Sequence, residues 1–458
     1  MLIASLAALA AASASGPIAQ HPTNPRIFAY KGKPTVLVTS AEHYGGVLNL
    51  GMDARRYLAA LKVDGLNYTR VFSGAYCESP ADFGIRHNTL APEAGKLICP
   101  WARSTTDGYA NGGSKFDLTR WDPAYFARLH AFVGEARKQG IIVEMALFCP
   151  FYGDTMWNLS PMKAANNVNG VGTCGREEVY ALKEEALTRV QEALTRKLTR
   201  EMNRHDNLFF EICNEPYFGG VTLEWQRRIS AAIADEESRL PKKHLIAQNI
   251  ANGSARVTDP DANVRVLNFH YTSPPVAVAE NADLKRIVTC DETGFQGTAD
   301  EPYRRQGWAF MLSGGGMYNN LDYSFTVAHP DGTATVEDPT PGGGGPGFRK
   351  QMATLLRFMN ALDLAAVAPD GSWLKPVDAA AQAYALARPG AQYAAYVCGG
   401  NGGGLTVTLP AGKYRVRWTQ PLTGVVTDRA CTSTGAALQI TPPDYPGEAA
   451  VLVTPKRG

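Results

Sequence analysis

The sequence has little excess charge of either sign. Lys and Arg together number 45, Asp and Glu number 43, and the formal net charge of the 458 residues is +2. This balance gives no reason to expect nucleic acid or a strongly charged polymer as a partner, and no obligate protein partner is evident. Because 45% of the residues are hydrophobic and 19% are charged, a largely disordered chain is excluded.

Closely spaced metal-ligating residues are also missing. The eight cysteines include no C-x-x-C pair, and the eight histidines include no H-x-H or H-x-x-x-H pair. The sequence therefore predicts no metal and no other cofactor. Disulfides between Cys77 and Cys99, and between Cys398 and Cys431, are compatible with an oxidising compartment, but spacing alone leaves them open.

Apolar runs long enough to cross a membrane are absent as well. Residues 2–14 form an apolar run that ends in small residues, with Ala12-Ser13-Ala14 as a candidate cleavage site. This run is similar to a secretory signal, although no Lys or Arg precedes it, and it is too short for a stable transmembrane helix. We expect a leader over residues 1–20, no membrane span, and a secreted or periplasmic protein.

The sequence contains no tandem repeat; instead, apolar segments alternate with amphipathic ones over most of its length. This alternation predicts an α/β chain with a closed (β/α)₈ barrel, a TIM barrel, over residues 21–370. The expected strands cover residues 35–40, 66–72, 141–148, 208–213, 244–248, 264–270, 287–292 and 316–321. The expected helices cover residues 53–63, 122–140, 177–204, 224–240 and 348–362.

Two stretches do not fit the barrel pattern. Residues 73–119 are rich in Gly, Pro, Asn and aromatic residues, and a loop this long in a compact domain is usually functional. From residue 371 the sequence changes to short alternating strands separated by glycine-rich turns. Residues 371–458 are therefore expected to form a small all-β sandwich domain.

The fourth expected strand runs directly into Asn214-Glu215-Pro216. Pro216 ends the strand, and the carboxyl end of a barrel strand is the usual position of a catalytic group. A strand-terminal Glu whose side chain reaches solvent would explain Glu215 equally well. A second glutamate, Glu292, ends the seventh expected strand and would face Glu215 across the mouth of the barrel.

The alternation of side chains along the seventh strand predicts which residues share a face. A period of two places Val288, Cys290 and Glu292 on one face and Asp291 on the other. Glu292 is accordingly the carboxylate of this strand that we expect to pair with Glu215.

An Asn-Glu-Pro motif late on strand four, combined with a glutamate that ends strand seven, resembles the large cellulase-like clan of retaining (β/α)₈ glycoside hydrolases, with family 5 and its relatives closest. The resemblance implies that Glu215 is the acid/base and Glu292 the nucleophile. Retaining enzymes hold these two carboxyl groups about 5–5.5 Å apart, and the proximity of like charges favours one protonated carboxyl. The implied protein is a secreted glycosidase that cleaves β-glycosidic bonds in an oligo- or polysaccharide.

The resemblance also implies two positions close to this pair. Arg70, on the second expected strand, resembles the arginine that hydrogen-bonds the nucleophile and keeps it ionised. A structural salt bridge between Arg70 and Glu211 or Glu144 is the alternative. Asn214 matches the asparagine that contacts the sugar 2-hydroxyl.

The sixth strand ends in His270-Tyr271, where the family 5 pattern is usually His-x-Tyr. Which of the two reaches the nucleophile stays open, and His270 could instead be a satisfied core histidine. The strand-eight tryptophan that is frequent in the clan is absent.

Further candidates for contacts with the sugar are His43, Tyr44, Trp157 and Asn320. Aromatic residues in loops that should gather at the same face are Trp101, Tyr109, Trp121, Tyr152, Trp157 and Tyr217.

Two other classes of function remain to be weighed. A non-catalytic carbohydrate-binding barrel would have no need of both glutamates, and both are present. A metal-dependent barrel hydrolase would need clustered His and Asp ligands, which the spacing of the histidines does not provide.

Overall fold

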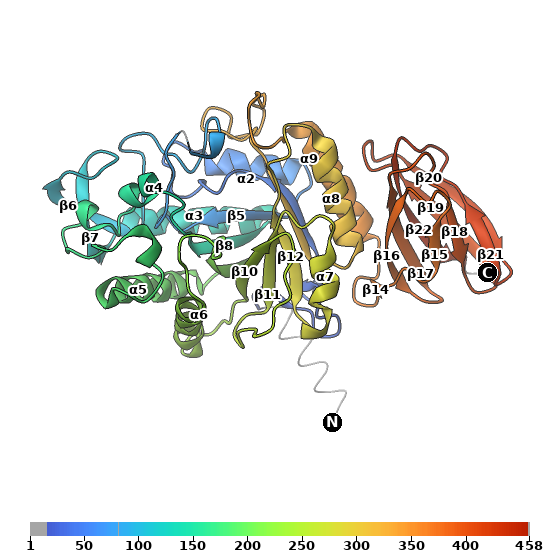
Figure 1. Cartoon of the computed structure of the whole chain (residues 1–458), viewed down its shortest axis with the longest axis horizontal. Coiled ribbons are helices and arrows are strands. Elements are labelled where there is room, and N and C mark those ends of the chain that lie inside the picture. The colour runs from blue at the N-terminus through green and yellow to red at the C-terminus, as the bar shows by residue number, and fades with distance from the viewer. Residues whose placement is uncertain (1–15, 81, 457–458) are drawn as a thin grey trace.

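Eight strands form one sheet in which every hydrogen-bonded neighbour is parallel (Figure 1). The computed structural model describes residues 16–80 and 82–456. The order in the sheet is β4-β13-β12-β11-β10-β9-β8-β5, and the Asn67 side chain bridges the two end strands through the Val38 N–H and the Val36 carbonyl, both at 2.9 Å. The strands are β4 (Leu37–Ala41), β5 (Tyr68–Phe72), β8 (Ile142–Phe148), β9 (Leu208–Cys213), β10 (Ile246–Asn252), β11 (Val266–His270), β12 (Ile287–Glu292) and β13 (Met317–Leu321).

Helices cover the outside of this sheet, as the predicted barrel requires. Their starts follow local sequence signals: the Asp53 carboxylate accepts the N–H groups of Arg55 and Arg56, and Asp122 caps a helix that begins with Pro123. The helices are α2 (Ala54–Val63), α3 (Pro123–Gln139), α4 (Asp154–Leu159), α5 (Glu185–Met202), α6 (Leu223–Ser238), α7 (Val276–Glu280), α8 (Asp300–Leu312) and α9 (Pro346–Asn360).

The (β/α)₈ barrel is thus confirmed, with four local corrections. The stretch expected as a loop over 73–119 contains a hairpin of β6 (Trp101–Asp107) and β7 (Ser114–Trp121). Helix α5 begins at Glu185 and not near residue 177. Strands β5, β10 and β11 each begin two residues later than expected, and α8 was not expected at all. Its apolar residues occur on every side because it packs between the barrel and the second domain, so it lacks an amphipathic pattern.

A small three-stranded sheet of β1 (Ala19–Gln20), β2 (Phe28–Tyr30) and β3 (Lys33–Thr35) precedes the barrel. Phe28 and the neighbouring Ile18 are fully buried in an apolar cluster with residues from the amino-terminal ends of the barrel strands. This end of the barrel is therefore filled, and a site must open at the other end. Residues 1–15, most of the expected leader, lie outside the described residues.

The expected β-sandwich is confirmed. A six-stranded antiparallel sheet, β14-β16-β17-β22-β19-β20, packs against a three-stranded one, β15-β18-β21, over a second apolar core. All eight cysteines of the chain are free thiols. The strands are β14 (Ala368–Pro369), β15 (Leu374–Pro376), β16 (Gln382–Arg388), β17 (Gln392–Cys398), β18 (Leu405–Thr408), β19 (Gly412–Thr419), β20 (Val426–Ser433), β21 (Ala437–Ile440) and β22 (Glu448–Pro455).

The sandwich is attached to the barrel through α8. Glu448 accepts hydrogen bonds from Arg304 Nε and from the Tyr396 hydroxyl, both at 2.7 Å, and all three residues are buried. Beside them Trp308 stacks on Tyr396 with ring centroids 5.6 Å apart. A buried, paired charge next to stacked aromatic rings gives this interface a defined geometry.

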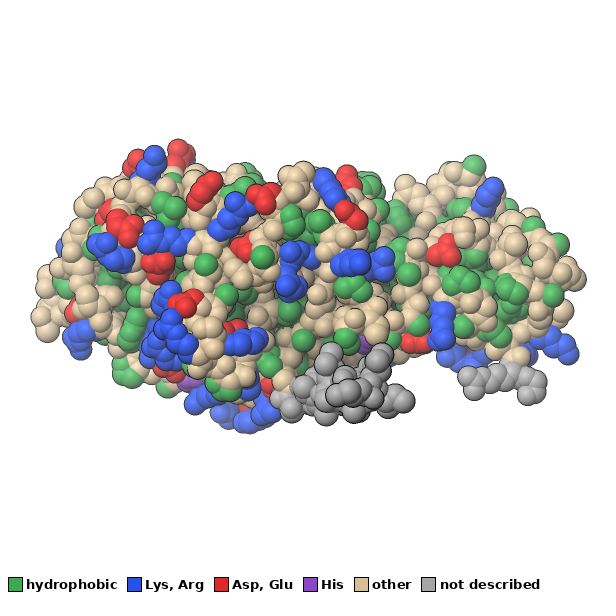
Figure 2. Space-filling model, turned by 90° about the horizontal axis from the view of Figure 1, so that it is seen from below, with side chains coloured by type: hydrophobic (Ala, Val, Ile, Leu, Met, Phe, Trp, Pro, Cys, Tyr) green, Lys and Arg blue, Asp and Glu red, His purple; other side chains and the backbone are tan. Residues whose placement is uncertain are grey.

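On the face seen in Figure 2, basic and acidic side chains are interspersed over the barrel. Ion pairs occur on the outside of the barrel, such as Arg228 with Glu192 at 2.8 Å. Within residues 16–80 and 82–456, no helix combines the length and the apolar composition that crossing a bilayer requires.

Candidate active site

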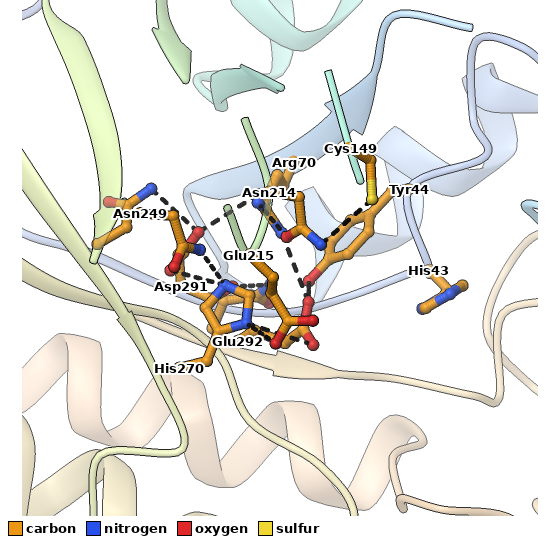
Figure 3. A network of polar contacts seen from close by, with 12 residues as sticks. His43, Tyr44, Arg70, Cys149, Asn214, Glu215, Asn249, His270, Asp291 and Glu292 are labelled. Atoms are coloured by element: carbon orange, nitrogen blue, oxygen red, sulfur yellow. Dashed lines mark hydrogen bonds and ion pairs between the residues drawn. The ribbon is translucent and has the colours of Figure 1, made fainter. Parts of the chain in front are cut away.

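Glu215 and Glu292 lie side by side at the open, carboxyl-terminal end of the barrel (Figure 3). Glu215 follows β9 and adopts a left-handed φ of 36°, which turns the chain immediately after the strand. One carboxylate oxygen of each glutamate and a ring nitrogen of His270 all lie within 4.8 Å of one another. The predicted meeting of strands four and seven at one site is therefore confirmed.

The predicted alternation along β12 is wrong at its last residue. The pairing of β11 with β12 runs in register as far as Phe269 and Cys290, then shifts so that His270 pairs with Glu292. This bulge adds one residue to β12. As a result Asp291 and Glu292 both reach the polar cluster inside the barrel, while Val288 and Cys290 belong to the apolar layer. Without the bulge, Glu292 would point into that layer.

Glu292 is held by three donors from different strands. The Tyr44 hydroxyl donates to Oε2 at 2.7 Å, the Tyr271 hydroxyl donates to Oε1, and Arg70 Nη1 lies 3.5 Å from Oε2. Three donors, one of them a permanent cation, stabilise the ionised carboxylate and fix its orientation.

Glu215 has a different set of partners. Its Oε2 accepts from the Tyr152 hydroxyl at 2.6 Å, while Oε1 accepts from the Tyr217 hydroxyl at 3.2 Å and lies 3.0 Å from His270 Nδ1. The same Nδ1 is 3.6 Å from Glu292 Oε1. The open question about His270-Tyr271 therefore has a structural answer: Tyr271 bonds Glu292, and His270 bonds Glu215 while facing both glutamates.

The histidine and the glutamate shift each other's protonation. Burial by itself would lower the pKa of His270, but the negative charges of Glu292 and Asp291 raise that pKa well above its ordinary value. Burial by itself would raise the pKa of Glu215, but the hydrogen bond and charge of His270 outweigh it and lower that pKa. Both shifts favour the arrangement in which the histidine, and not the glutamate, holds the proton between them.

Below the pair, Arg70 lies among several carboxylates in the barrel interior. Arg70 donates to Glu211 through Nε at 3.1 Å and through Nη2, donates to Asn214 Oδ1 at 2.8 Å, and lies 3.4 Å from Asp291. Its side chain is fully buried. Both interpretations of Arg70 thus apply, because it forms a structural ion pair with Glu211 and also reaches Glu292.

The remaining carboxylate of the interior, Glu144, is fully buried and accepts hydrogen bonds from Tyr68 and from Asn268, the latter at 2.6 Å. Burial and repulsion by Asp291 raise the pKa of Glu144 well above its ordinary value. Burial also raises the pKa of Glu211, although Arg70 opposes the shift. The charge of Arg70 therefore does not neutralise every interior carboxyl group. Among Glu144 and Glu211, Glu144 is the one more strongly disposed to hold a proton.

Two groups of residues bring potential metal ligands together. One is Glu215, His270 and Glu292; the other is Glu144, Glu211 and Asp291. In both groups the carboxylates already accept hydrogen bonds from tyrosine, asparagine or arginine side chains. These donors occupy the lone pairs that a cation would need, so the donor set fits proton and hydrogen-bond chemistry better than metal binding.

A small cavity of about 40 Å³ lies above the two glutamates. Its apolar wall comes from loops that follow the strands, and its polar wall includes both glutamates. Its lining residues are His43, Tyr44, Phe72, Glu78, Phe83, Ile85, Leu90, Tyr152, Asn214, Glu215, Tyr271, Glu292 and Phe295. Backbone strain concentrates here, because five of these residues, none of them glycine, have left-handed φ angles between 36° and 61°. The five are Tyr44, Phe83, Glu215, Tyr271 and Phe295.

Six of the predicted site residues line this cavity: Glu215, Glu292, Asn214, His43, Tyr44 and Tyr271. Arg70 and His270 lie just beneath it.

Two expectations need correction. Trp157 is buried against Phe151 and donates to the Cys174 carbonyl, and Asn320 is buried between Ser40 and Leu321. Neither lines the cavity, because Trp157 belongs to helix α4 and packs away from it, and Asn320 lies on the side of β13 away from the site.

Other residues of the site had no sequence signal of their own. Tyr152 and Tyr217 were only two of several loop aromatics, and nothing distinguished them from Trp101, which is fully buried. Glu78 and Phe83 fall in the long segment after β5, whose length was the only indication of a role. Residues that are far apart along a loop acquire a shared function only through the folding of that loop.

Comparison with protein-family models and with curated proteins gives no match. Solved structures do match. A putative glycoside hydrolase from Bacteroides vulgatus aligns with a TM-score of 0.66 at 14% identity, covering 96% of this chain and 82% of that one. A glycoside hydrolase family 5 protein from the same species aligns with a TM-score of 0.63 at 12% identity, covering 96% and 94%. A family 5 mannosidase from Rhizomucor miehei aligns with a TM-score of 0.51 at 13% identity, covering 76% and 100%.

The class that these findings define is a (β/α)₈ barrel with a C-terminal β-sandwich, in the fold of glycoside hydrolases of the family 5 type. At 12–14% identity the similarity establishes that fold and leaves the activity to be argued from the site.

The interior ion pair can be tested through stability. Arg70→Met should lower the free energy of unfolding by about 3–5 kcal/mol, because it leaves buried carboxylates without their cation. Adding Glu211→Gln should restore part of this loss, since one fewer buried charge then lacks a partner. Urea unfolding followed by tryptophan fluorescence measures both variants. Arg228→Met, which removes exposed ion pairs with Glu185 and Glu192, is the matched control and should cost at most about 1 kcal/mol. Equal losses in Arg70→Met and the control would contradict the interpretation.

Proposed function

We propose that this protein is a retaining β-glycosidase in which Glu292 is the nucleophile and Glu215 the acid/base. The observation that carries the proposal is the pair of glutamates, with carboxylate oxygens within 4.8 Å of each other in one cavity. Retaining glycosidases hold their two carboxyl groups about 5–5.5 Å apart, whereas inverting ones leave about 6.5–9.5 Å for a water molecule. The short separation favours double displacement.

The different surroundings of the two glutamates support the assignment of roles. Glu292 is near the Arg70 guanidinium and accepts two tyrosine hydroxyls, so it is suited to remain ionised and attack the anomeric carbon. Glu215 is 3.0 Å from a protonated His270, so a proton is available along that hydrogen bond. Asn214 lines the cavity beside Glu215 and is placed to contact the sugar 2-hydroxyl.

The reaction then proceeds in two displacements. Glu292 forms a bond to the anomeric carbon while Glu215 donates a proton to the departing glycosidic oxygen, and a glycosyl ester on Glu292 results. In the second step Glu215 takes a proton from water, the water oxygen bonds the anomeric carbon, and Glu292 leaves as a carboxylate.

His270 couples these proton transfers to the charge of Glu292. The imidazolium is stabilised by the negative charges of Glu292 and Asp291. When Glu292 becomes an ester, that stabilisation falls, and the proton on Nδ1 moves more readily to Glu215. We therefore treat Glu215 and His270 as a pair that shares one catalytic proton.

The substrate is proposed to be an oligo- or polysaccharide with β-linked sugars, acted on outside the cytoplasm. The small formal net charge of +2 suits a neutral polymer better than a charged one. Among the structures of similar fold, one is a mannosidase, so β-mannosides belong in the first set of substrates to be tried.

The nucleophile assignment predicts chemical rescue. Glu292→Ala should lower turnover of a cognate 2,4-dinitrophenyl β-glycoside by a factor on the order of 10³ or more, because no carboxylate remains to attack. Added azide should restore turnover and yield the α-glycosyl azide, since the small anion attacks from the same side as the missing carboxylate. Product analysis by NMR decides the configuration, and undiminished activity in the variant would refute the assignment.

The acid/base assignment predicts a dependence on the leaving group. Glu215→Ala should retain most of the first step on 2,4-dinitrophenyl glycosides, whose leaving groups need no proton, and lose about 10²–10⁴-fold on alkyl or disaccharide leaving groups. Burst kinetics separate the two steps. A uniform loss over all leaving groups would exclude Glu215 as the acid, and Glu93→Ala, an exposed glutamate outside the cavity, is the control.

The shared proton predicts a pH effect. Because activity needs one proton on the Glu215–His270 pair, kcat/KM should stay high up to the raised pKa of His270, above 6.5, and fall at higher pH as that proton is lost. In His270→Asn, Glu215 must hold the proton alone, so the alkaline fall should move to lower pH. The exposed His87, changed to Asn, is the control. An alkaline limb at the same pH in His270→Asn would show that the histidine does not share the catalytic proton.

A further inference from the structure

A third carboxylate, Glu78, lies in the wall of the same cavity and has no part in the proposed displacement. Its Oε1 accepts from the Tyr76 hydroxyl at 3.0 Å, and its Oε2 accepts from Asn88 Nδ2 at 2.5 Å. His43 Nε2 lies 3.2 Å from the same Oε2. Glu78 is 5% exposed and His43 is 9% exposed, so a carboxylate and an imidazole are fixed together at the edge of the cavity.

This dyad has unused hydrogen-bonding capacity. An ionised carboxylate offers about four lone-pair positions, and the three donors around Glu78 occupy three of them. The other ring nitrogen of His43, Nδ1, is buried without any partner. Leaving such an atom unpaired costs about 1–3 kcal/mol, a cost that a ligand hydroxyl in contact with Nδ1 would remove.

The charge state of the dyad is also suited to a hydroxyl. Burial by itself would lower the pKa of His43, but the adjacent Glu78 carboxylate raises it. A protonated His43 has a free N–H at Nδ1, which donates, while Glu78 accepts. A hydroxyl group both accepts and donates, and two hydroxyls on adjacent carbons would match the pair.

The wall that carries Glu78 is firmly anchored and so preorganised. The Glu78 N–H donates to the Leu90 carbonyl at 2.9 Å, and Thr89 Oγ1 donates to the buried Glu42 at 2.5 Å. Gly45 packs so closely on this segment that a Cβ there would lie 2.1 Å from the Thr89 carbonyl oxygen. The dyad is therefore held in place before any ligand binds, which reduces the entropy that binding must overcome.

The dyad is also connected to the proposed nucleophile, because His43 is followed directly by Tyr44, which contacts Glu292. His43 stacks on Tyr44 with ring centroids 5.3 Å apart, and Tyr44 donates to Glu292. Two consecutive residues after β4 thus face the two ends of one ligand, its anomeric carbon and its ring hydroxyls.

We infer that Glu78 and His43 bind ring hydroxyls of the sugar whose anomeric carbon faces Glu292, and that they restrict the substrate to glycosides in which those hydroxyls are free. This inference rests on the proposed glycosidase function and adds the residues that select the sugar. Substrates with O-methyl or O-acetyl groups at those positions are excluded, because they cannot donate to Glu78 and do not fit against its anchored wall.

The test is a cycle of enzyme and substrate changes. The wild-type protein is first tried on 4-nitrophenyl β-glucoside, β-mannoside, β-galactoside and β-xyloside, and the best of them is prepared in its monodeoxy forms. Glu78→Gln and His43→Gln should each lower kcat/KM on the parent glycoside by about 10- to 100-fold, the effect of losing a hydrogen bond to a charged group. On the deoxy form that lacks the partner hydroxyl, the variant and the wild type should be equal within about twofold, because the contact no longer exists.

Controls separate this role from a structural one. His43→Gln can keep the contact with Glu78, so it reports the loss of the Nδ1 hydrogen bond even if Glu78→Gln disturbs the loop. Circular dichroism with thermal melting checks that both variants are folded. Glu93→Gln, an exposed glutamate of the same segment outside the cavity, should leave kcat/KM unchanged.

The outcomes separate a failure of the proposed glycosidase function from a failure of the role inferred for Glu78 and His43. If the wild type cleaves none of the four glycosides, the proposed function fails. If the wild type cleaves one of them and Glu292→Ala does not, the glycosidase function stands. If, in that case, Glu78→Gln and His43→Gln lose no activity, or lose the same factor on every deoxy form, the inference about the dyad is overturned.

Discussion

The structure depends above all on one buried cation. Arg70 is the arginine of the barrel interior, where it pairs with Glu211, approaches Asp291 and reaches Glu292. An isolated carboxylate in such a place would take up a proton, whereas Glu292 has this guanidinium and two tyrosine hydroxyls as partners. The surroundings of the proposed nucleophile are thus set from inside the barrel, one layer below the cavity.

The second glutamate is controlled by a cation of a different kind. His270 stands between Glu215 and Glu292, and the negative charges of Glu292 and Asp291 raise its pKa although burial opposes the shift. Unlike an arginine, a histidine releases its proton when the surrounding charge changes. The permanent cation beside one carboxylate and the titratable cation beside the other create an asymmetry that suits the proposed nucleophile and acid/base, although the two residues are chemically identical.

The cavity above this charged layer is built by loops, and its precision has a conformational cost. Five lining residues other than glycine adopt left-handed φ angles, each of which costs on the order of 1 kcal/mol or more. The packed barrel and the anchored segment from Glu78 to Leu90 supply the contacts that maintain them. This arrangement explains why the segment after β5 is long: it carries an internal wall, with a hairpin beyond it, and is not a simple connection.

The sequence by itself determined the barrel, the sandwich and the two glutamates, because strand periodicity, helix caps and a motif at a strand end are local signals. It also identified most of the cavity residues that follow strands directly, such as Tyr44 and Tyr271. Tertiary structure alone decided the bulge that turns Glu292 inward, the helix α8 that packs on both domains, and the positions of Glu78, Tyr152 and Trp157. These features result from contacts between segments far apart in the chain, and such contacts leave no periodic pattern in either segment.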